Sequence, residues 1–373
     1  MKYSPLLRIS YDEFGNRFYD KTVEERIPID GMIELTRRCN LKCAYCYAVP
    51  DSSKKELTYR QIRPILNEIT KCGCLWLAFT GGDPLIRDDF LDIYAYAKKK
   101  GLIISLLTNG TLITRRIADY FKKYPPWLID ITLNGITKKT YEDVTGVPGS
   151  FERCLGGIQL LIERNIPLQL KTTVTTLNID ELGEIKKYVE SLGIDFRFDA
   201  VLHPAVDGSK TPCEFRISPA EVVKLDLADQ KRSEKLREFF RKAKGPSQAD
   251  KLYNCGAGVN SFHINPYGEL GMCILPQETS YNLCKGSFIK GWYDFIPKIR
   301  EQKRKRKSRC LNCSLFTLCG PCPDWAQLEI GDRQKPIDHM CRITRLRAEA
   351  FGREVKRKWE AESDKKDFME NHS

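Results

Sequence analysis

The sequence lacks any apolar run that is long enough to cross a membrane. Runs such as LIISLL at residues 102–107 are far shorter than the ~20 apolar residues that a transmembrane helix needs. The first ten residues, MKYSPLLRIS, also lack the apolar segment of a signal peptide. These absences argue against a membrane partner and against secretion, so we expect a cytoplasmic protein.

The cysteines do not make an even, paired set, because the chain has 15 of them. In a reducing compartment such a set is not a disulfide framework, so metal or redox chemistry is the better interpretation. Four cysteines lie outside every motif, and we expect them to be ordinary buried thiols: Cys72, Cys74, Cys154 and Cys213.

A recognisable RNA-binding module is also lacking, although the formal net charge is +12. Much of this charge lies in the run KIREQKRKRKSR at residues 298–309 and in the charged tail. The basic run indicates a solvated helix face or a contact with an acidic peptide or nucleic acid. RNA modification therefore stays a weaker hypothesis, and nucleic acid is not the expected partner.

The first two thirds of the chain alternate between two kinds of segment. Apolar, β-branched runs predict strands and amphipathic stretches predict helices between them. This alternation is typical of right-handed parallel βαβ units, so we expect a partial (β/α)6 TIM-like barrel, with a doubly wound open sheet as the alternative. The predicted strands span 31–35, 75–79, 102–107, 128–133, 168–174 and 195–201, and the predicted helices span 58–70, 87–100, 114–123, 150–164 and 179–192.

Polar motifs follow all six predicted strands. They are TRRC, TGGDP, TNGT, LNG, TTLN and HP, in chain order. In barrel folds the carboxyl ends of the strands carry the active site. We therefore expect these six loops to meet at one catalytic rim.

The domain organisation follows from a change in composition near residue 235, after which cysteines become frequent. We expect an N-terminal extension at 1–28, a core domain at 29–235, a small cysteine-rich domain at 236–350 and a charged tail at 351–373.

Cys39, Cys43 and Cys46 form a C-x₃-C-x₂-C motif after the first strand. Zinc sites usually use four ligands in paired C-x₂-C units, although a zinc site with a distant ligand is an alternative. Three thiolates fit three irons of a [4Fe–4S] cluster, which leaves the fourth iron open to a small molecule.

This motif resembles the signature of the radical S-adenosylmethionine (SAM) superfamily, with Tyr45 at its aromatic position. The resemblance implies that SAM chelates the open iron and that its reductive cleavage yields a 5′-deoxyadenosyl radical. It also implies that GGDP, Gly81–Gly82–Asp83–Pro84, contacts the SAM ammonium, with Asp83 in place of the usual Glu. Asn109 in TNG and Asn134 in LNG are further implied SAM contacts, and Asn178 is a weaker one; an Asx-type turn is the alternative.

The C-terminal cysteines resemble the SPASM extension of radical SAM enzymes that modify peptides. The pattern is C-x₁₂-G-x₄-C, then C-x₂-C-x₅-C-x₂-C, then a lone cysteine, where the family more often has C-x₃-C at the last pair. A zinc ribbon is the alternative. The resemblance implies one auxiliary [4Fe–4S] cluster on Cys255, Cys273 and Cys322, with Cys284 as a possible fourth ligand, and a second on Cys310, Cys313, Cys319 and Cys341.

These resemblances imply an oxidoreductase that crosslinks or oxidises a ribosomally made peptide or protein. Its cofactors would be SAM and three [4Fe–4S] clusters, and its electron donor would be a flavodoxin or ferredoxin. About 28 residues precede the first strand, which is too short for a fused leader-binding domain, so a separate leader-peptide-binding protein is expected. A sulfatase-type maturase is an alternative that loses ground because Ile274 occupies the position of its Asp base. A non-enzymatic metal-stapled scaffold is the last alternative.

Overall fold

The computed structural model describes residues 10–242, 250–275, 279–305 and 309–351. The chain divides into two compact units. Unit 1 consists of Met1–Arg216 and Cys255–Gln302, and unit 2 consists of Ile217–Asn254 and Lys303–Ser373. The predicted boundary at residue 235 falls inside helix α9 (Gln230–Lys242), and the four-part domain division stays a prediction.

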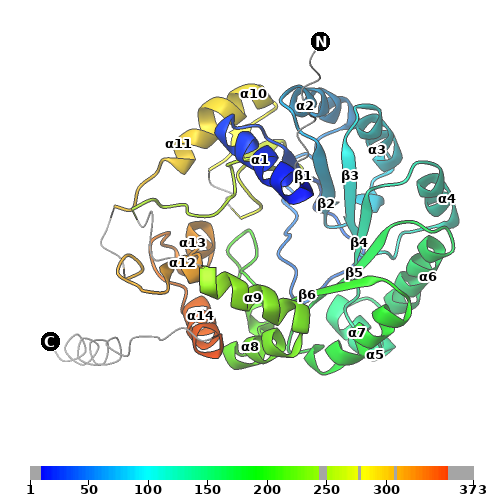
Figure 1. Cartoon of the computed structure of the whole chain (residues 1–373). Helices are drawn as coiled ribbons and strands as arrows, with labels where there is room; N and C mark the ends of the chain where they lie inside the picture. The colour runs from blue at the N-terminus through cyan, green and yellow to red at the C-terminus, as the bar shows by residue number, and fades with distance from the viewer. Residues whose placement is uncertain (1–9, 243–249, 276–278, 306–308, 352–373) are drawn as a thin grey trace, which may run out of the picture. The chain divides into compact units, whose positions relative to one another are not determined.

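Unit 1 is built on a nine-stranded sheet with the order β6-β5-β4-β3-β2-β1-β7-β8-β9. Strands β1 to β6 are parallel neighbours in chain order, which confirms the partial barrel and rules out a doubly wound sheet. Figure 1 shows these strands curving around one side of the unit. They are β1 (Asp30–Thr36), β2 (Trp76–Gly81), β3 (Ile103–Thr108), β4 (Leu128–Thr132), β5 (Leu168–Thr173) and β6 (Asp195–Asp199).

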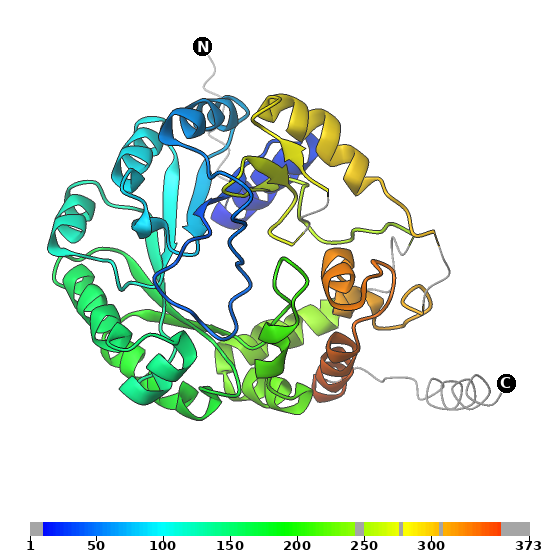
Figure 2. The ribbon, with the colours of Figure 1, turned by 180° about the vertical axis from the view of Figure 1, so that it is seen from behind.

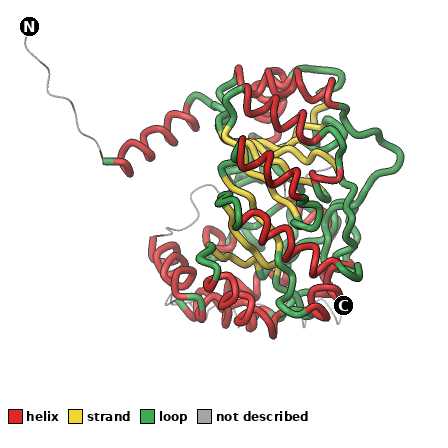
Figure 3. Tube along the Cα trace, turned by 90° about the vertical axis from the view of Figure 1, so that its right-hand side faces the viewer, coloured by secondary structure: helices red, strands yellow, loops and turns green. Residues whose placement is uncertain are grey.

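Helices α2 to α7 of unit 1 pack outside the strands, as Figures 2 and 3 show. The five predicted helices are all present, at bounds within three residues of those expected. Helix α1, which precedes the first strand, and helix α5, a short helix between β4 and α6, were not predicted. The helices are α1 (Tyr11–Glu24), α2 (Tyr59–Lys71), α3 (Phe90–Lys99), α4 (Arg115–Lys123), α5 (Lys138–Thr145), α6 (Ser150–Ile162), α7 (Leu182–Ser191), α10 (Phe288–Lys290) and α11 (Ile296–Arg300).

Local capping explains where two of these helices begin. The Thr58 and Gln61 side chains form a capping box at α2, and the Thr114 hydroxyl accepts from the Ile117 N–H at 3.3 Å. Helix α3 begins at Phe90, later than predicted, because Arg87 is extended after the 3₁₀ turn at Pro84–Ile86. This turn holds the end of the GGDP motif.

Three further strands come from the cysteine-rich segment and were not predicted. Strand β7 (Ser261–Ile264) pairs parallel with β1, with Met32 opposite His263, and β8 (Glu269–Gly271) and β9 (Tyr281–Asn282) extend the sheet antiparallel. These strands have two to four residues, too few for a period-2 pattern to be distinguished from a loop. A seventh parallel strand therefore joins the barrel on the far side of β1.

Unit 2 is helical in the part that the structure describes. Its core contains Phe240, Leu315, Leu318 and Ala348. The buried Asp226 carboxylate pairs with the guanidinium groups of Arg232 and Arg347, so its charge is compensated. The helices are α8 (Pro219–Ala228), α9, α12 (Phe316–Cys319), α13 (Pro323–Ile330) and α14 (Asp338–Ala350).

Among the described residues of both units, no helix has the length and apolar character that a membrane span requires.

Candidate active site

The three-cysteine loop runs from the end of β1 to the start of α2 through the interior of unit 1, as the blue segment in Figures 1 and 2 shows. The N–H groups of Lys42 and Ala44 donate to the Thr145 and Val144 carbonyls at 2.8 and 2.9 Å. These carbonyls lie at the C-terminal end of α5, where helix carbonyls lack intrahelical partners. The loop is therefore docked on α5, a helix that sequence reasoning did not find.

The two ends of this loop are held by residues that sequence reasoning also missed. The Glu56 carboxylate accepts from the Thr36 hydroxyl at 2.5 Å, the Arg37 N–H at 3.1 Å and the Arg38 Nε at 3.2 Å. Arg87 Nη1 donates to the Leu35 carbonyl at 2.9 Å and to the Leu57 carbonyl at 3.0 Å. Both side chains form hydrogen bonds to segments that lie far from them in the sequence. No local sequence pattern therefore predicts these contacts.

The GGDP motif packs directly against the start of the cysteine loop. The N–H groups of Gly82 and Asp83 donate to the Thr36 and Arg38 carbonyls at 2.8 and 3.0 Å. A Cβ on Gly81 would lie 2.0 Å from the Thr36 oxygen, and one on Gly82 would lie 2.3 Å from the Arg38 oxygen. Gly81 also has φ of +147°, which favours glycine. The two glycines are therefore required by the close approach of two strand-end loops.

The Asp83 side chain is fully buried and forms three hydrogen bonds to protein donors. Its Oδ1 accepts from the Leu85 N–H at 2.9 Å. Its Oδ2 accepts from the Thr108 hydroxyl at 2.7 Å and from the Asn109 N–H at 2.8 Å. Burial raises the pKa of Asp83, and these hydrogen bonds oppose the rise. The carboxylate therefore joins the GGDP loop to the TNG loop, and its contact with the SAM ammonium stays a proposal.

An Asp83→Asn substitution is expected to lower the free energy of unfolding of the apoprotein by about 1–3 kcal/mol. Each carboxylate oxygen of Asp83 accepts a hydrogen bond from a backbone N–H. In asparagine one of these oxygens becomes an NH₂ group, which cannot accept, so one backbone N–H loses its partner in either orientation of the amide. Urea unfolding of the two proteins without SAM measures the change. Asp88→Asn, at an exposed carboxylate nearby, is the matched control and should leave stability unchanged. Equal stability of Asp83→Asn and the parent would show that these hydrogen bonds contribute nothing.

Asn109 connects the TNG loop to the first cysteine. Its Nδ2 lies 3.6 Å from the Cys39 Sγ and 3.0 Å from the Asn40 Oδ1. Its Oδ1 accepts from the Thr111 N–H at 2.9 Å, which is an Asx-type turn. The turn that was the alternative to SAM binding is thus present, and the side chain also holds the cysteine loop.

A second chain of contacts joins the LNG loop to the middle of the cysteine motif. The Tyr45 hydroxyl donates to the Asn134 Oδ1 at 2.6 Å, and burial raises the pKa of Tyr45. The Asn178 Nδ2 donates to the Asn134 carbonyl at 2.9 Å. Asn178 also closes a turn by accepting from the Thr175 N–H at 2.8 Å. Motif residues from three strands therefore meet around the loop, as the sequence predicted, while their contacts to SAM stay proposals.

The three thiols of the loop lie close enough to affect one another. Burial is the largest cause that raises the pKa of Cys39, Cys43 and Cys46, and Cys46 also raises the pKa values of Cys39 and Cys43. Burying three neighbouring thiolates is costly unless a cation replaces their protons. A donor set of three thiolates in one half-buried loop fits the [4Fe–4S] cluster that the motif implies. The fit lies in the number and kind of donors. Their side chains are not arranged as a metal site, since no group of three or more His, Cys, Asp or Glu residues among the described residues is positioned to hold a metal ion.

A buried ionisable cluster lies on the neighbouring strands β1 and β7. Glu34 is 0% exposed, and its Oε2 lies 3.3 Å from the Arg37 Nε and 3.9 Å from the His263 Nε2. Burial raises the pKa of Glu34, whereas burial and the Arg37 charge lower the pKa of His263 to about 3. His263 is therefore neutral in the folded protein at physiological pH. Sequence reasoning missed this cluster because it requires the unpredicted strand β7.

His263 is expected to make the fold sensitive to acid. Below about pH 6.5 His263 takes up a proton in the unfolded chain but not in the folded chain. The free energy of unfolding therefore decreases as the pH is lowered from about 6.5 to about 3. This corresponds to about 2 kcal/mol between pH 7.5 and pH 5. Glu34 acts with the opposite sign, because its raised pKa lets the folded protein take up a proton first. His263→Phe should remove the His263 contribution, measured as the difference in urea stability between variant and parent at each pH. A pH-independent difference would contradict this account.

Four cysteines of unit 2 that the sequence proposes as cluster ligands lie around the same cavity. Cys310, Cys313, Cys319 and Cys341 line one cavity. Burial raises the pKa of Cys319 to about 11, with smaller contributions from the thiols of Cys341, Cys310 and Cys313. Four thiols of this kind fit the four-thiolate set of a [4Fe–4S] cluster, and the cluster itself stays a proposal.

The other predicted cluster combines cysteines of both units, so its assembly stays a prediction. Within unit 1, Cys255 and Cys284 are exposed and Cys273 is half-buried. The four cysteines outside the motifs are not all buried as expected. Cys74 and Cys154 are, but Cys72 and Cys213 are half-buried because they lie in the turns after α2 and at Thr211–Phe215.

The fold and the site together define a class of protein: a partial α/β barrel whose strand-end loops surround a three-cysteine motif. Comparison with protein families identifies residues 33–191 as a match to the Radical SAM superfamily. This match confirms, for residues 33–191, the resemblance seen in the sequence. Members of this superfamily are enzymes that use SAM and a [4Fe–4S] cluster.

Some individual relatives are similar to this chain over most of its length. An AdoMet-dependent heme synthase from Methanosarcina barkeri is 26% identical over 325 residues, which cover 80% of this chain and 92% of that protein. The antilisterial bacteriocin subtilosin biosynthesis protein AlbA from Bacillus subtilis is 27% identical over 341 residues, 83% of this chain and 72% of AlbA. A crystal structure of Streptococcus suis SuiB bound to the precursor peptide SuiA has a TM-score of 0.68 at 17% identity, covering 91% of this chain and 84% of that chain. This last likeness shows the fold.

Proposed function

We propose that this chain is a radical SAM enzyme that modifies a ribosomally made peptide or protein. The observation that carries the proposal is the pair of cysteine groups, one in the strand-end loop of unit 1 and one around the cavity of unit 2. A similarity to AlbA over 83% of the chain supports a peptide substrate. A single cluster suffices to cleave SAM, so additional cysteine sites indicate a reaction that also moves an electron from the product or binds the substrate.

The residues of unit 1 have separable roles in this proposal. Cys39, Cys43 and Cys46 would hold three irons, and Asn109 would fix the position of the Cys39 sulfur. Bound cluster and SAM together supply a one-electron reduction that breaks a C–S bond of the sulfonium. Gly81 and Gly82 would let the GGDP loop lie against the start of the cysteine loop, because a Cβ at either position would meet the Thr36 or Arg38 backbone.

The residues of unit 2 and the remaining cysteines would hold two auxiliary [4Fe–4S] clusters. Together with the SAM-binding cluster, the chain would hold about twelve irons. We propose Cys310, Cys313, Cys319 and Cys341 for one, and Cys255, Cys273 and Cys322 for the other. A flavodoxin or ferredoxin is the proposed electron donor, and a separate leader-peptide-binding protein is a proposed partner.

A second candidate function is modification of a tetrapyrrole. It is favoured by the heme synthase that matches 80% of the chain. The two functions differ in the substrate that increases SAM turnover. Short open reading frames beside the gene would supply candidate peptides, and an iron coproporphyrin would serve as the tetrapyrrole.

The test measures 5′-deoxyadenosine formation and substrate mass with each candidate under anaerobic conditions. A mass change in a peptide that depends on SAM supports the proposed function. Modification of the tetrapyrrole, with every neighbouring peptide unchanged, would replace it by the second candidate.

A further inference from the structure

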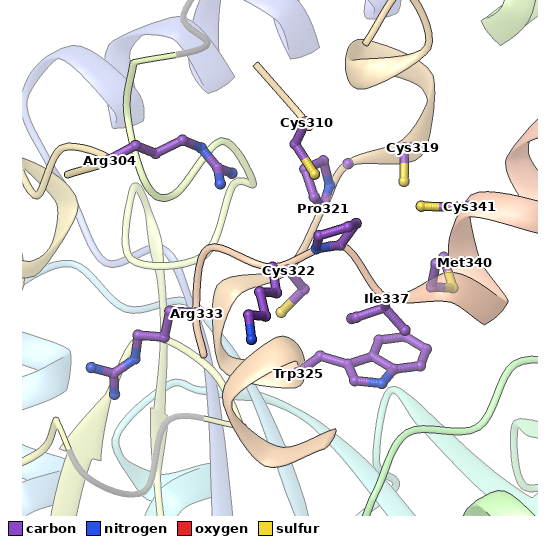
Figure 4. Close-up of a pocket in the computed structure, with 13 residues that line it drawn as sticks. Arg304, Cys310, Cys319, Pro321, Cys322, Trp325, Arg333, Ile337, Met340 and Cys341 are labelled. Carbon is purple, nitrogen blue, oxygen red and sulfur yellow. The ribbon is translucent and has the colours of Figure 1, made fainter. Parts of the chain in front are cut away.

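A cavity of about 160 Å³ lies inside unit 2, next to the cysteines (Figure 4). Four thiols and three cationic side chains line it. Such a combination differs from an ordinary apolar cavity, because cations that face each other without an anion repel. The thiols are those of Cys310, Cys319, Cys322 and Cys341, and the cations are those of Arg304, Arg333 and Lys335.

Among these cations, Arg304 has buried donors with no hydrogen-bond partner. Its Nε and Nη2 atoms are buried and make no hydrogen bond within the described part of the chain. Figure 4 shows its guanidinium pointing from the edge of the cavity towards Cys310. A buried donor left without an acceptor is destabilising, so the arrangement indicates an acceptor that belongs in the cavity.

The Arg304 side chain is held in this position from two sides. Its guanidinium carbon lies 5.4 Å from the centre of the Phe316 ring, which is a cation–π contact. Its backbone N–H donates to the Asp250 carbonyl at 2.8 Å, which fixes the segment that carries it. The charge is therefore pre-positioned beside the thiols.

The other two cations of the cavity are compensated or exposed. The Arg333 Nε lies 3.3 Å from the Asp324 Oδ1, and Figure 4 shows its guanidinium turned away from the cysteines. Lys335 is exposed, so water screens its charge. Arg309 and Arg345 line a neighbouring cavity at the same cysteines. Among the cations of the present cavity, Arg304 is the one with buried donors that lack a partner in the described part of the chain.

A [4Fe–4S] core and its four thiolate ligands together carry a net negative charge. This charge becomes more negative by one unit when the cluster accepts an electron. Hydrogen bonds to the sulfur atoms and nearby positive charge stabilise the reduced form more than the oxidised form. They therefore raise the reduction potential. The Arg304 side chain is half-buried, but its Nε and Nη2 donors are buried, so their interaction with sulfur is weakened less by water than that of exposed donors.

We propose that Arg304 is a positioning residue that donates its Nε–H and Nη2–H to sulfur atoms of the cluster in unit 2 and raises the reduction potential of that cluster. The proposal rests on the proposed function in one respect, since it requires that unit 2 binds an auxiliary cluster. The electron that reduces the cluster comes from the substrate radical or from an external donor. Arg304 raises the potential of this one-electron reduction.

The test uses the full chain with Cys39, Cys43, Cys46, Cys255 and Cys273 replaced by alanine, so that the cluster in unit 2 is the one left. Iron is counted after anaerobic reconstitution, and the midpoint potential is measured by a redox titration followed by EPR. Arg304→Gln should retain the iron and lower the midpoint by at least 59 mV, a tenfold change in the ratio of reduced to oxidised cluster. Arg304→Lys should restore part of the shift, and Lys335→Gln is the control that should leave the potential unchanged.

Three outcomes would overturn the proposal in distinguishable ways. An unchanged midpoint in Arg304→Gln, with iron retained, would mean that Arg304 does not act on the cluster. Loss of iron from both Arg304 variants would limit Arg304 to cluster assembly and would refute its effect on the potential. Absence of iron from the parent of this series would refute the auxiliary cluster itself, and with it this part of the proposed function.

Discussion

Replacing Cys39, Cys43 and Cys46 together by alanine is expected to remove about four irons per chain after reconstitution. It is also expected to abolish the formation of 5′-deoxyadenosine. The three thiols lie in one loop that is docked on α5 and held by Asn109. This loop contains no fourth cysteine that could replace them. Iron analysis and chromatography of the SAM products measure the two effects.

A double Cys72→Ala and Cys213→Ala variant is the matched control for this experiment. Both thiols are half-buried and lie outside the motifs. This variant should keep its iron and its SAM cleavage. Undiminished SAM cleavage in the triple variant would contradict the assignment of the site.

Gly82→Ala is expected to have the second largest effect, a fall in SAM cleavage of about 100-fold. The added Cβ would lie 2.3 Å from the Arg38 oxygen and 2.8 Å from the Arg37 oxygen. Both are backbone atoms at the start of the cysteine loop, so the loop must shift to make room. A displacement of about 1 Å between cluster and SAM is enough for a loss of this size.

The control for Gly82→Ala is Gly183→Ala in helix α7, where an added Cβ meets nothing within 4 Å. That substitution should leave SAM cleavage unchanged. Normal SAM cleavage by Gly82→Ala would show that the close approach of the two loops has no role in the reaction.

The barrel and the meeting of its strand-end loops were predictable because their signals are local. Strands such as Ile103–Thr108 are short, mostly apolar runs, and Thr58 and Thr114 mark helix starts by their own hydrogen bonds. The motifs GGDP and TNG follow strands directly, so parallel topology alone brings them to one edge. The residues that meet around Cys39 and Tyr45 were therefore anticipated as a group.

The supports of the site were not predictable, because they depend on contacts between distant segments. Glu56 and Arg87 bind the ends of the cysteine loop, and neither belongs to a motif. Strand β7 has four residues, and the buried Glu34–His263 pair exists because β7 lies beside β1. The role of Asp83 was missed for a related reason, since a sequence motif does not show which partners bury its carboxylate.

The most direct measurement of the central claim is the reaction of the reconstituted parent protein with SAM and dithionite, without added substrate. The account predicts that 5′-deoxyadenosine and methionine form in equal amounts, and that a protein loaded with zinc instead of iron forms neither. A parent protein that contains an intact [4Fe–4S] cluster and binds SAM, yet yields no 5′-deoxyadenosine, would contradict the claim that this chain performs radical SAM chemistry.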